Sequence, residues 1–136
     1  MSVSPWLSAW LSALSTWPTW AWWLVAFAAA MQLAFMVLEM ALWTKIAAPK
    51  VANLHGDFAD KTVKLGQNMG LYNGLLGAGL VLALYAPPNF GIPLALYLLV
   101  FMLVAGIFGG RTVKWTIAAL QGGPAFAALL ALYARW

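Results

Sequence analysis

The chain has 136 residues, of which 65% are hydrophobic and only 7% are charged, a composition typical of membrane proteins rather than of soluble domains. The net charge of +4 does not indicate a nucleic-acid partner, because the basic residues do not cluster on a polar domain. With no cysteine and one histidine, we expect no disulfide, no metal centre and no cofactor.

The first residues predict a short helix that lies in the membrane interface. Ser4 and Pro5 suit the start of a helix, as an N-cap and a first helical position. From there to about residue 16, tryptophans and serines follow helical spacing on separate faces, which is typical of an interfacial amphipathic helix. The alternative is a frayed tail. A cleaved signal peptide is disfavoured because no basic residue precedes the apolar run.

The first membrane helix is predicted at about residues 20–43, which is long enough to cross a bilayer. Trp20 and Trp43 would mark its two interfaces. Gln32 and Glu39 share one helical face, seven residues apart. That face is expected to look into protein, because a carboxylate that faces lipid is costly.

A polar loop is expected at residues 44–64, with four lysines, His55 and two aspartates. We interpret it as a solvated loop rather than as a ligand site. The second helix is predicted at about residues 63–85. It carries one stripe of glycines at spacings of four, four and three, which would let a neighbouring helix approach closely: Gly66, Gly70, Gly74 and Gly77. Asn73 lies close to this stripe, whereas Asn68 lies on roughly the opposite side, so we expect this helix near the centre of a bundle.

An uncharged turn is expected at residues 86–93, and the third helix at about 94–109. After a short basic hairpin at 111–114, the fourth helix is predicted at about 114–133. Pro124 should kink this helix, because it has no N–H for the carbonyl four residues earlier. Gln121 lies in the turn before that kink.

Together these elements predict an all-α fold: one domain over residues 1–136, formed by a four-helix transmembrane bundle with a short interfacial N-terminal helix. Six of the seven basic residues lie in the loops 44–64 and 111–114. The positive-inside rule therefore predicts that both loops are cytoplasmic and that both termini lie outside, on the far side of the bacterial inner membrane.

Several motifs resemble a family of small bacterial four-helix integral membrane proteins catalogued as a domain of unknown function. The similar segments are Leu38-Glu39-Met40 with Trp43, the block from Asn68 to Gly74, Ala105-Gly106-Ile107-Phe108-Gly109, and Gln121-Gly122-Gly123-Pro124-Ala125. The resemblance implies the four-helix fold and its topology, but no activity. Family members carry a histidine seven residues before the glutamate, and Gln32 stands there in this chain.

Five polar side chains are predicted to lie in the cytoplasmic half of the membrane or at its midplane, from a rise of about 1.5 Å per residue. They are Glu39, Gln32, Asn68, Asn73 and Gln121. If they converge, they form a ligand-binding pocket that opens to the cytoplasm. The alternative is that the amides only bond neighbouring helices. Glu39 would then pair with Asn68, Tyr72 or Gln121, or with Arg111 or Lys114 near the interface.

No serine–histidine pair, paired carboxylates or phosphate loop is evident, so an enzyme is disfavoured. Two functions remain. In the first, the protein binds or moves a small polar or amphipathic solute through the pocket. In the second, it is a structural or accessory subunit that offers its glycine stripe to a second copy or to a larger membrane complex. The expected partners are the lipid bilayer and a small-molecule ligand, and no nucleic acid.

Overall fold

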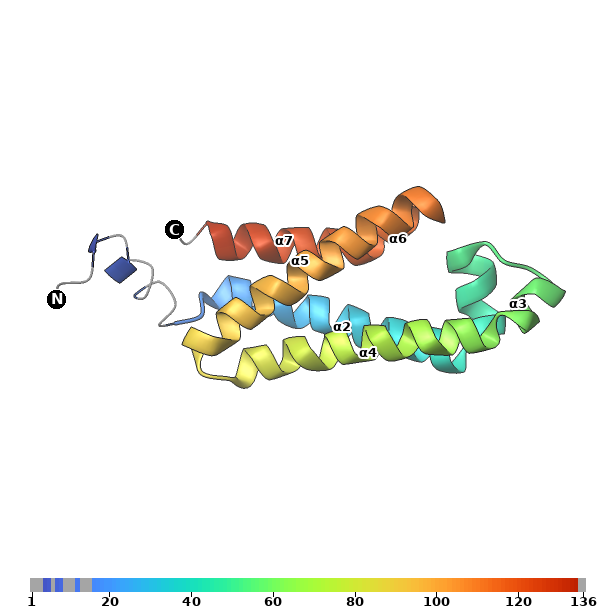
Figure 1. The fold of residues 1–136 in the computed structure, drawn as a ribbon, viewed down its shortest axis with the longest axis horizontal. Coiled ribbons are helices and arrows are strands. Elements are labelled where there is room, and N and C mark those ends of the chain that lie inside the picture. The colour runs from blue at the N-terminus through green and yellow to red at the C-terminus, as the bar shows by residue number, and fades with distance from the viewer. Residues whose placement is uncertain (1–3, 6, 9–11, 13–15, 135–136) are drawn as a thin grey trace.

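The computed structural model describes residues 4, 5, 7, 8, 12 and 16–134, and these residues contain helices and no strand. The all-α fold is therefore confirmed for the described part of the chain. The predicted interfacial helix at about 5–16 falls largely outside the described residues. From Thr19 onward the helices are α2 (Thr19–Ala41), η1 (Trp43–Ala52), α3 (Asp57–Lys61), α4 (Val63–Tyr85), α5 (Pro88–Thr112), α6 (Trp115–Ile117), η2 (Ala118–Gly122) and α7 (Gly123–Tyr133), where η1 and η2 are π-helical (Figure 1).

The long helices run side by side along one axis (Figure 1). The start of α2, the turn between α4 and α5, and the end of α7 lie at one end of the molecule. The segments η1 and α3 and the turn between α5 and α6 lie toward the other. By length and composition, α2, α5 and the continuous segment Trp115–Tyr133 could each cross a membrane. α4 is as long as α2, but its glycines and its polar residues Gln67, Asn68 and Asn73 lower its hydropathy.

α4 packs along α2 more extensively than any other pair of helices does. The four glycines of the predicted stripe are all buried, and each lies against α2 or the residue that opens η1. A Cβ atom on Gly66 would meet Trp43, one on Gly70 would meet Met40, one on Gly74 would meet Met36, and one on Gly77 would meet Leu33. Because the partner numbers fall as the glycine numbers rise, the two helices are antiparallel. Without side chains on this stripe, the two backbones come close.

The stretch 44–64, which was expected to be a polar loop, is largely helical, so that prediction is wrong. Its apolar residues form a small core with Trp43, built from Ala47, Ala48 and Ala59. The Trp43 indole Nε1 donates to the Ala59 carbonyl oxygen at 3.1 Å and to the Thr62 hydroxyl oxygen at 3.2 Å. Trp43 is 4% exposed, so its indole packs inside the protein rather than on the outer surface. Through these hydrogen bonds and this small core, Trp43 holds η1 and α3 against the end of α2.

The third helix begins at Pro88, six residues before the predicted start, so the predicted turn at 86–93 is too long. Prolines suggested a turn, yet Pro88 occupies the first helical position, where its missing N–H would have no intrahelical partner. Pro93 lies inside the helix and leaves only the carbonyl four residues earlier without its usual donor. A Cβ atom on Gly91 would meet the Ala83 carbonyl oxygen, so this glycine lets α5 start directly against α4.

The last helix contains a π turn, η2, immediately before Pro124. Pro124 cannot donate a hydrogen bond to the Leu120 carbonyl oxygen. The helix therefore departs from regular α geometry before this proline, and it does so as a wider π turn. On α5, a Cβ atom at Gly106 would lie 2.6 Å from the backbone nitrogen of Gly122. The backbones of α5 and η2 are therefore in direct contact.

We predict that Gly106→Ala lowers the melting temperature of the protein in mild detergent. The new methyl group would meet backbone atoms of Gly122, which cannot move aside as a side-chain end can, at a cost of about 1–3 kcal/mol. Gly123→Ala is the matched control, because no atom lies within 4 Å of its Cβ position. That control should leave the melting temperature unchanged or raise it, since alanine favours helix. Equal melting temperatures for the two variants would contradict the close contact of α5 with η2.

Candidate functional site

Three of the five predicted polar residues meet near the end of the molecule that carries η1 and α3. They come from three elements: Glu39 from α2, Asn73 from α4 and Gln121 from η2. The Asn73 amide Nδ2 donates to Glu39 Oε2 at 2.6 Å. The Gln121 amide Nε2 donates in turn to Asn73 Oδ1 at a longer 3.4 Å. A carboxylate and two amides thus form one hydrogen-bonded row across the bundle.

The antiparallel packing of α2 on α4 explains why Asn73 reaches Glu39. Gly70 lies against Met40 and the Cβ of Glu39, and Gly74 lies against Met36. Asn73 lies between these two glycines on α4, and so it lies beside Glu39 on α2. The close approach of the backbones brings a short amide side chain within hydrogen-bond distance of the carboxylate. Glu39 therefore has an amide as its partner rather than Arg111 or Lys114, and Lys114 Nζ lies 3.4 Å from the Lys50 carbonyl oxygen instead.

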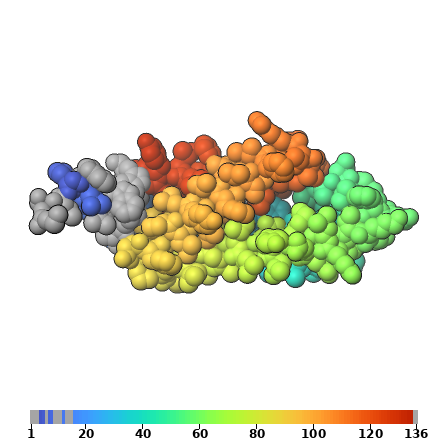
Figure 2. All heavy atoms as spheres, viewed as in Figure 1, coloured from blue at the N-terminus to red at the C-terminus, as the bar shows by residue number. Residues whose placement is uncertain are grey.

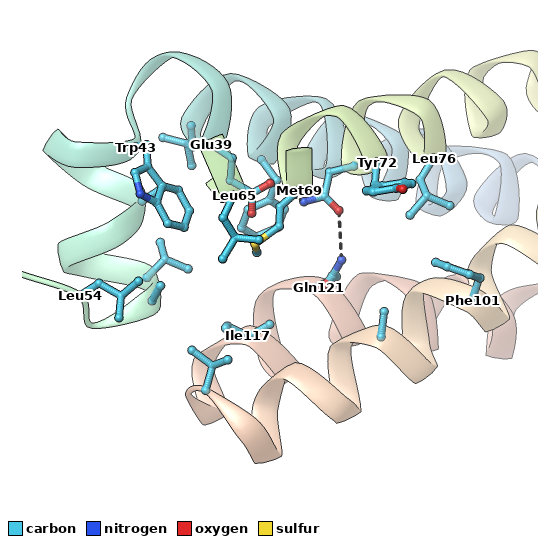
Figure 3. Close-up of a pocket in the computed structure, with 18 residues that line it drawn as sticks. Glu39, Trp43, Leu54, Leu65, Met69, Tyr72, Leu76, Phe101, Ile117 and Gln121 are labelled. Carbon is cyan, nitrogen blue, oxygen red and sulfur yellow. Dashed lines mark hydrogen bonds between the residues drawn. The ribbon is translucent and has the colours of Figure 1, made fainter. Parts of the chain in front are cut away.

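The hydrogen-bonded row lies on the wall of a cavity of about 410 Å³. Glu39, Tyr72, Asn73 and Gln121 are the polar members of a lining that is otherwise dominated by apolar side chains. Figure 3 shows Gln121 on the wall opposite Met69 and Tyr72, with Trp43 and Leu54 at one end of the cavity and Phe101 toward the other. Such a site, largely apolar with a few convergent polar groups, is typical of pockets for small organic ligands.

The other two predicted site residues do not line this cavity. Asn68 is exposed. It lies five positions before Asn73, so the two side chains point from different faces of α4. Gln32 is fully buried in α2, and neither atom of its side-chain amide has a hydrogen-bond partner. The depth estimate grouped these residues with Glu39, but depth alone does not fix the direction of a side chain.

The sequence analysis missed most of the apolar lining. Three residues of η1, together with Leu54 just beyond it, close one end of the cavity: Ala47, Val51, Ala52 and Leu54. They were assigned to a solvated loop. The sequence did contain a signal for a packed segment, because these apolar residues are interspersed among its lysines. Phe101 and Ala105 of α5 also line the cavity. Ala105 belongs to one of the motifs that carry the family resemblance, but nothing in the apolar sequence around Phe101 distinguished that residue.

The described residues contain no group of three or more histidine, cysteine, aspartate or glutamate side chains that could hold a metal ion. Glu39 is the carboxylate of the cavity, and the other lining residues offer amide, phenol, indole, thioether or hydrocarbon groups. This arrangement can bind an amphipathic molecule. It would present a carboxylate to a hydrogen-bond donor or a cation, and an apolar wall to the rest of the ligand.

We predict that Gln32→Met raises the melting temperature of the protein in mild detergent. A buried amide without partners loses its interactions with water and gains none, at a cost of about 1–3 kcal/mol, and methionine of similar shape removes that cost. Gln121→Met is the control, because it removes the donor to Asn73 and should lower the melting temperature or leave it unchanged. If Gln32→Met instead destabilised the protein, Gln32 would have a bound partner.

Comparison with known proteins identifies a family but no activity. A protein of Lactococcus lactis subsp. lactis (strain IL1403), named "Uncharacterized protein YpaA", is 32% identical over 69 residues, which cover 51% of this chain and 57% of that protein. The chain thus spans little more than half the length of this relative. No solved structure matches the chain significantly. Residues 26–133 match the family described as "Protein of unknown function (DUF1304)", and the chain belongs to that family.

Proposed function

We propose that the protein crosses the membrane four times and binds a small amphipathic molecule in the cavity beside Glu39. The observation that carries the proposal is the hydrogen-bonded row of Glu39, Asn73 and Gln121 on the wall of a largely apolar cavity of about 410 Å³. Close packing through a bundle would leave no such space. The cavity offers an apolar surface for the body of a ligand and a carboxylate for its polar end.

α4 is proposed as the fourth membrane span, beside the three helices that qualify by their hydropathy. It runs antiparallel along α2 over most of its length, so embedding α2 in lipid embeds α4 as well. Its buried glycines face α2, and its Asn73 amide is bonded to Glu39. The buried glycines and Asn73 are thus turned toward protein. Gln67 and Asn68 are exposed, as are Leu71, Leu75 and Leu82 on the outer surface of the helix.

The orientation proposed for this bundle follows the distribution of its basic residues. Four lysines lie between residues 45 and 64, and Arg111 and Lys114 flank the turn between α5 and α6. Both segments lie toward the same end of the molecule (Figure 1). The positive-inside rule therefore supports a cytoplasmic location for this end and an outer location for both termini.

The ligand-binding function is preferred to a purely structural one for a specific reason. The structural alternative used the glycine stripe of α4 as the contact surface for a partner or a second copy. In the folded chain, Gly66, Gly70, Gly74 and Gly77 are buried and lie against α2 and Trp43. An external helix could not use this stripe without displacing α2.

We predict that Glu39→Gln weakens binding of the lipophilic cation tetraphenylphosphonium by about tenfold or more. The substitution keeps an oxygen acceptor for Asn73 and removes the charge, and two opposite unit charges about 4 Å apart near a protein surface attract each other by about 4 kcal/mol. Isothermal titration calorimetry on protein in mild detergent measures the change. Asp60→Asn is the matched control, because it removes an exposed carboxylate of α3 and should leave binding unchanged.

Neutral triphenylphosphine oxide serves as a second ligand, and its binding should differ little between the wild-type protein and Glu39→Gln. Unchanged tetraphenylphosphonium affinity in Glu39→Gln, with an unchanged melting temperature, would exclude Glu39 as the ligand-binding carboxylate. Absence of binding to the wild-type protein by either compound would count against an accessible cavity.

We predict that a periplasm-specific reporter fused after the C-terminus is active in cells, because four crossings place both termini outside. The same reporter inserted between Gly56 and Asp57, in the turn before α3, should be inactive. Activity of the inserted reporter and inactivity of the C-terminal fusion would reverse the orientation. Activity of both fusions would mean that the number of crossings between these two sites is even.

A further inference from the structure

The cavity is closed on two sides, by Trp43 with η1 and by α2. Trp43 is 4% exposed, and its indole is hydrogen-bonded to Ala59 and Thr62. Ala47 is 3% exposed and lines the same end. On the α2 side, Phe35 and Glu39 are each 8% exposed and form the inner wall. A ligand therefore has no wide path into the cavity past η1 or through α2.

The same cavity is open along the side of the bundle, between α4 and α5. Five of its lining residues are also well exposed on the outer surface: Leu65, Met69 and Tyr72 of α4, Phe101 of α5, and Val113, which follows α5. Figure 2 shows the surface hollowed where α4, α5 and η1 come together. At membrane depth this side of the bundle faces lipid, so the opening connects the cavity to the bilayer.

The opening arises because α4 and α5 lie close together near the turn that joins them and diverge beyond it. There, Gly91 lies against the Ala83 carbonyl oxygen, and a Cβ atom on Gly79 would lie 2.9 Å from Leu98. Beyond this region the two helices diverge toward η1 and α6 (Figure 1). Met69 of α4 and Ala105 of α5 both line the cavity, so the space between the diverging helices is not filled by side chains there.

A second apolar hollow, of about 450 Å³, continues from this opening along the outer surface of α5. Phe101 and Ala105 line both spaces. Its other lining residues are Tyr97, Val100, Val104 and Phe108, all of them exposed on α5. An extended apolar chain could therefore lie along α5 in the lipid while the end of the molecule enters the cavity.

We propose that the ligand is a single-chain amphiphile with an amine headgroup, and that it enters the cavity from the bilayer through the opening between α4 and α5. This inference rests on the proposed binding function and names its ligand class. The alkyl chain would occupy the hollow along α5, and the amine would reach Glu39. A carboxylate accepts hydrogen bonds from an ammonium group and attracts its charge, whereas it repels a fatty-acid headgroup.

The test uses two photoreactive lipids that differ only in the headgroup: a long-chain primary amine and the matching alcohol, each with a diazirine in the alkyl chain. The full-length protein is reconstituted in phosphatidylcholine nanodiscs with either lipid, irradiated, and mapped by mass spectrometry. We expect the amine to label residues around Met69 and Phe101 several-fold more than the alcohol does. Glu39→Gln should remove this difference, and Asp60→Asn should preserve it.

Two variants of the opening test the route. Ala105→Trp should reduce labelling by the amine several-fold, because the indole would fill the space shared by the two hollows. Ile107→Trp is its control, since Ile107 is exposed on α5 and lines neither hollow. Phe101→Ala should widen the opening and increase labelling of cavity residues. This opposite result keeps the test decisive if Ala105→Trp fails to fold.

Equal labelling by the amine and the alcohol would overturn the ligand class, and labelling that neither Ala105→Trp nor Phe101→Ala alters would overturn the lateral route. In both cases, Glu39-dependent binding of tetraphenylphosphonium would leave the proposed function standing. If neither the amine nor tetraphenylphosphonium depended on Glu39, the proposed function itself would fail.

Discussion

The close packing of α4 on α2 is the constraint on which the rest of the structure depends. Four glycines on α4 face α2 and Trp43, and a Cβ atom at any of them would meet a neighbouring side chain at less than ordinary contact distance. In a membrane there is little hydrophobic force between helices, so close van der Waals contact and interhelical hydrogen bonds must hold them together. The same packing fixes the register of the pair, and that register brings Asn73 to Glu39.

The register also explains how a carboxylate can be buried in an apolar bundle. An ionisable side chain at membrane depth is costly unless protein groups or water satisfy it. Glu39 accepts a hydrogen bond from Asn73, which is itself bonded to Gln121 of the π turn before Pro124. Gln32 lies on the same face of α2, two helical turns away, without a partner. The bundle thus satisfies one polar group of this face and leaves another unsatisfied.

The cavity results from two departures from simple helix packing. α4 and α5 diverge from their shared turn, and η1 folds back over the wider end, held by the hydrogen bonds of Trp43. Without the divergence the space would be filled, and without η1 this end of the cavity would be open. Trp43 therefore has two roles, because its ring also packs against Gly66 at the end of the α2–α4 contact. The shape of the cavity and its lateral opening depend on this one side chain and on the angle between two helices.

The sequence by itself determined that the chain is helical and apolar enough for a membrane, since long apolar runs with almost no charge permit little else. It also singled out Glu39, Asn73 and Gln121 as unusual polar residues within those runs. Only the tertiary structure decided which of the five predicted polar residues meet. Residues at equal depth can point to different faces, as Asn68 and Asn73 do, and a buried amide such as Gln32 can lie away from the cavity. The structure also decided that the segment after Trp43 folds into helices. Its lysines suggested a solvated loop, and its small apolar core forms only when Trp43 and Ala59 come together in the folded chain.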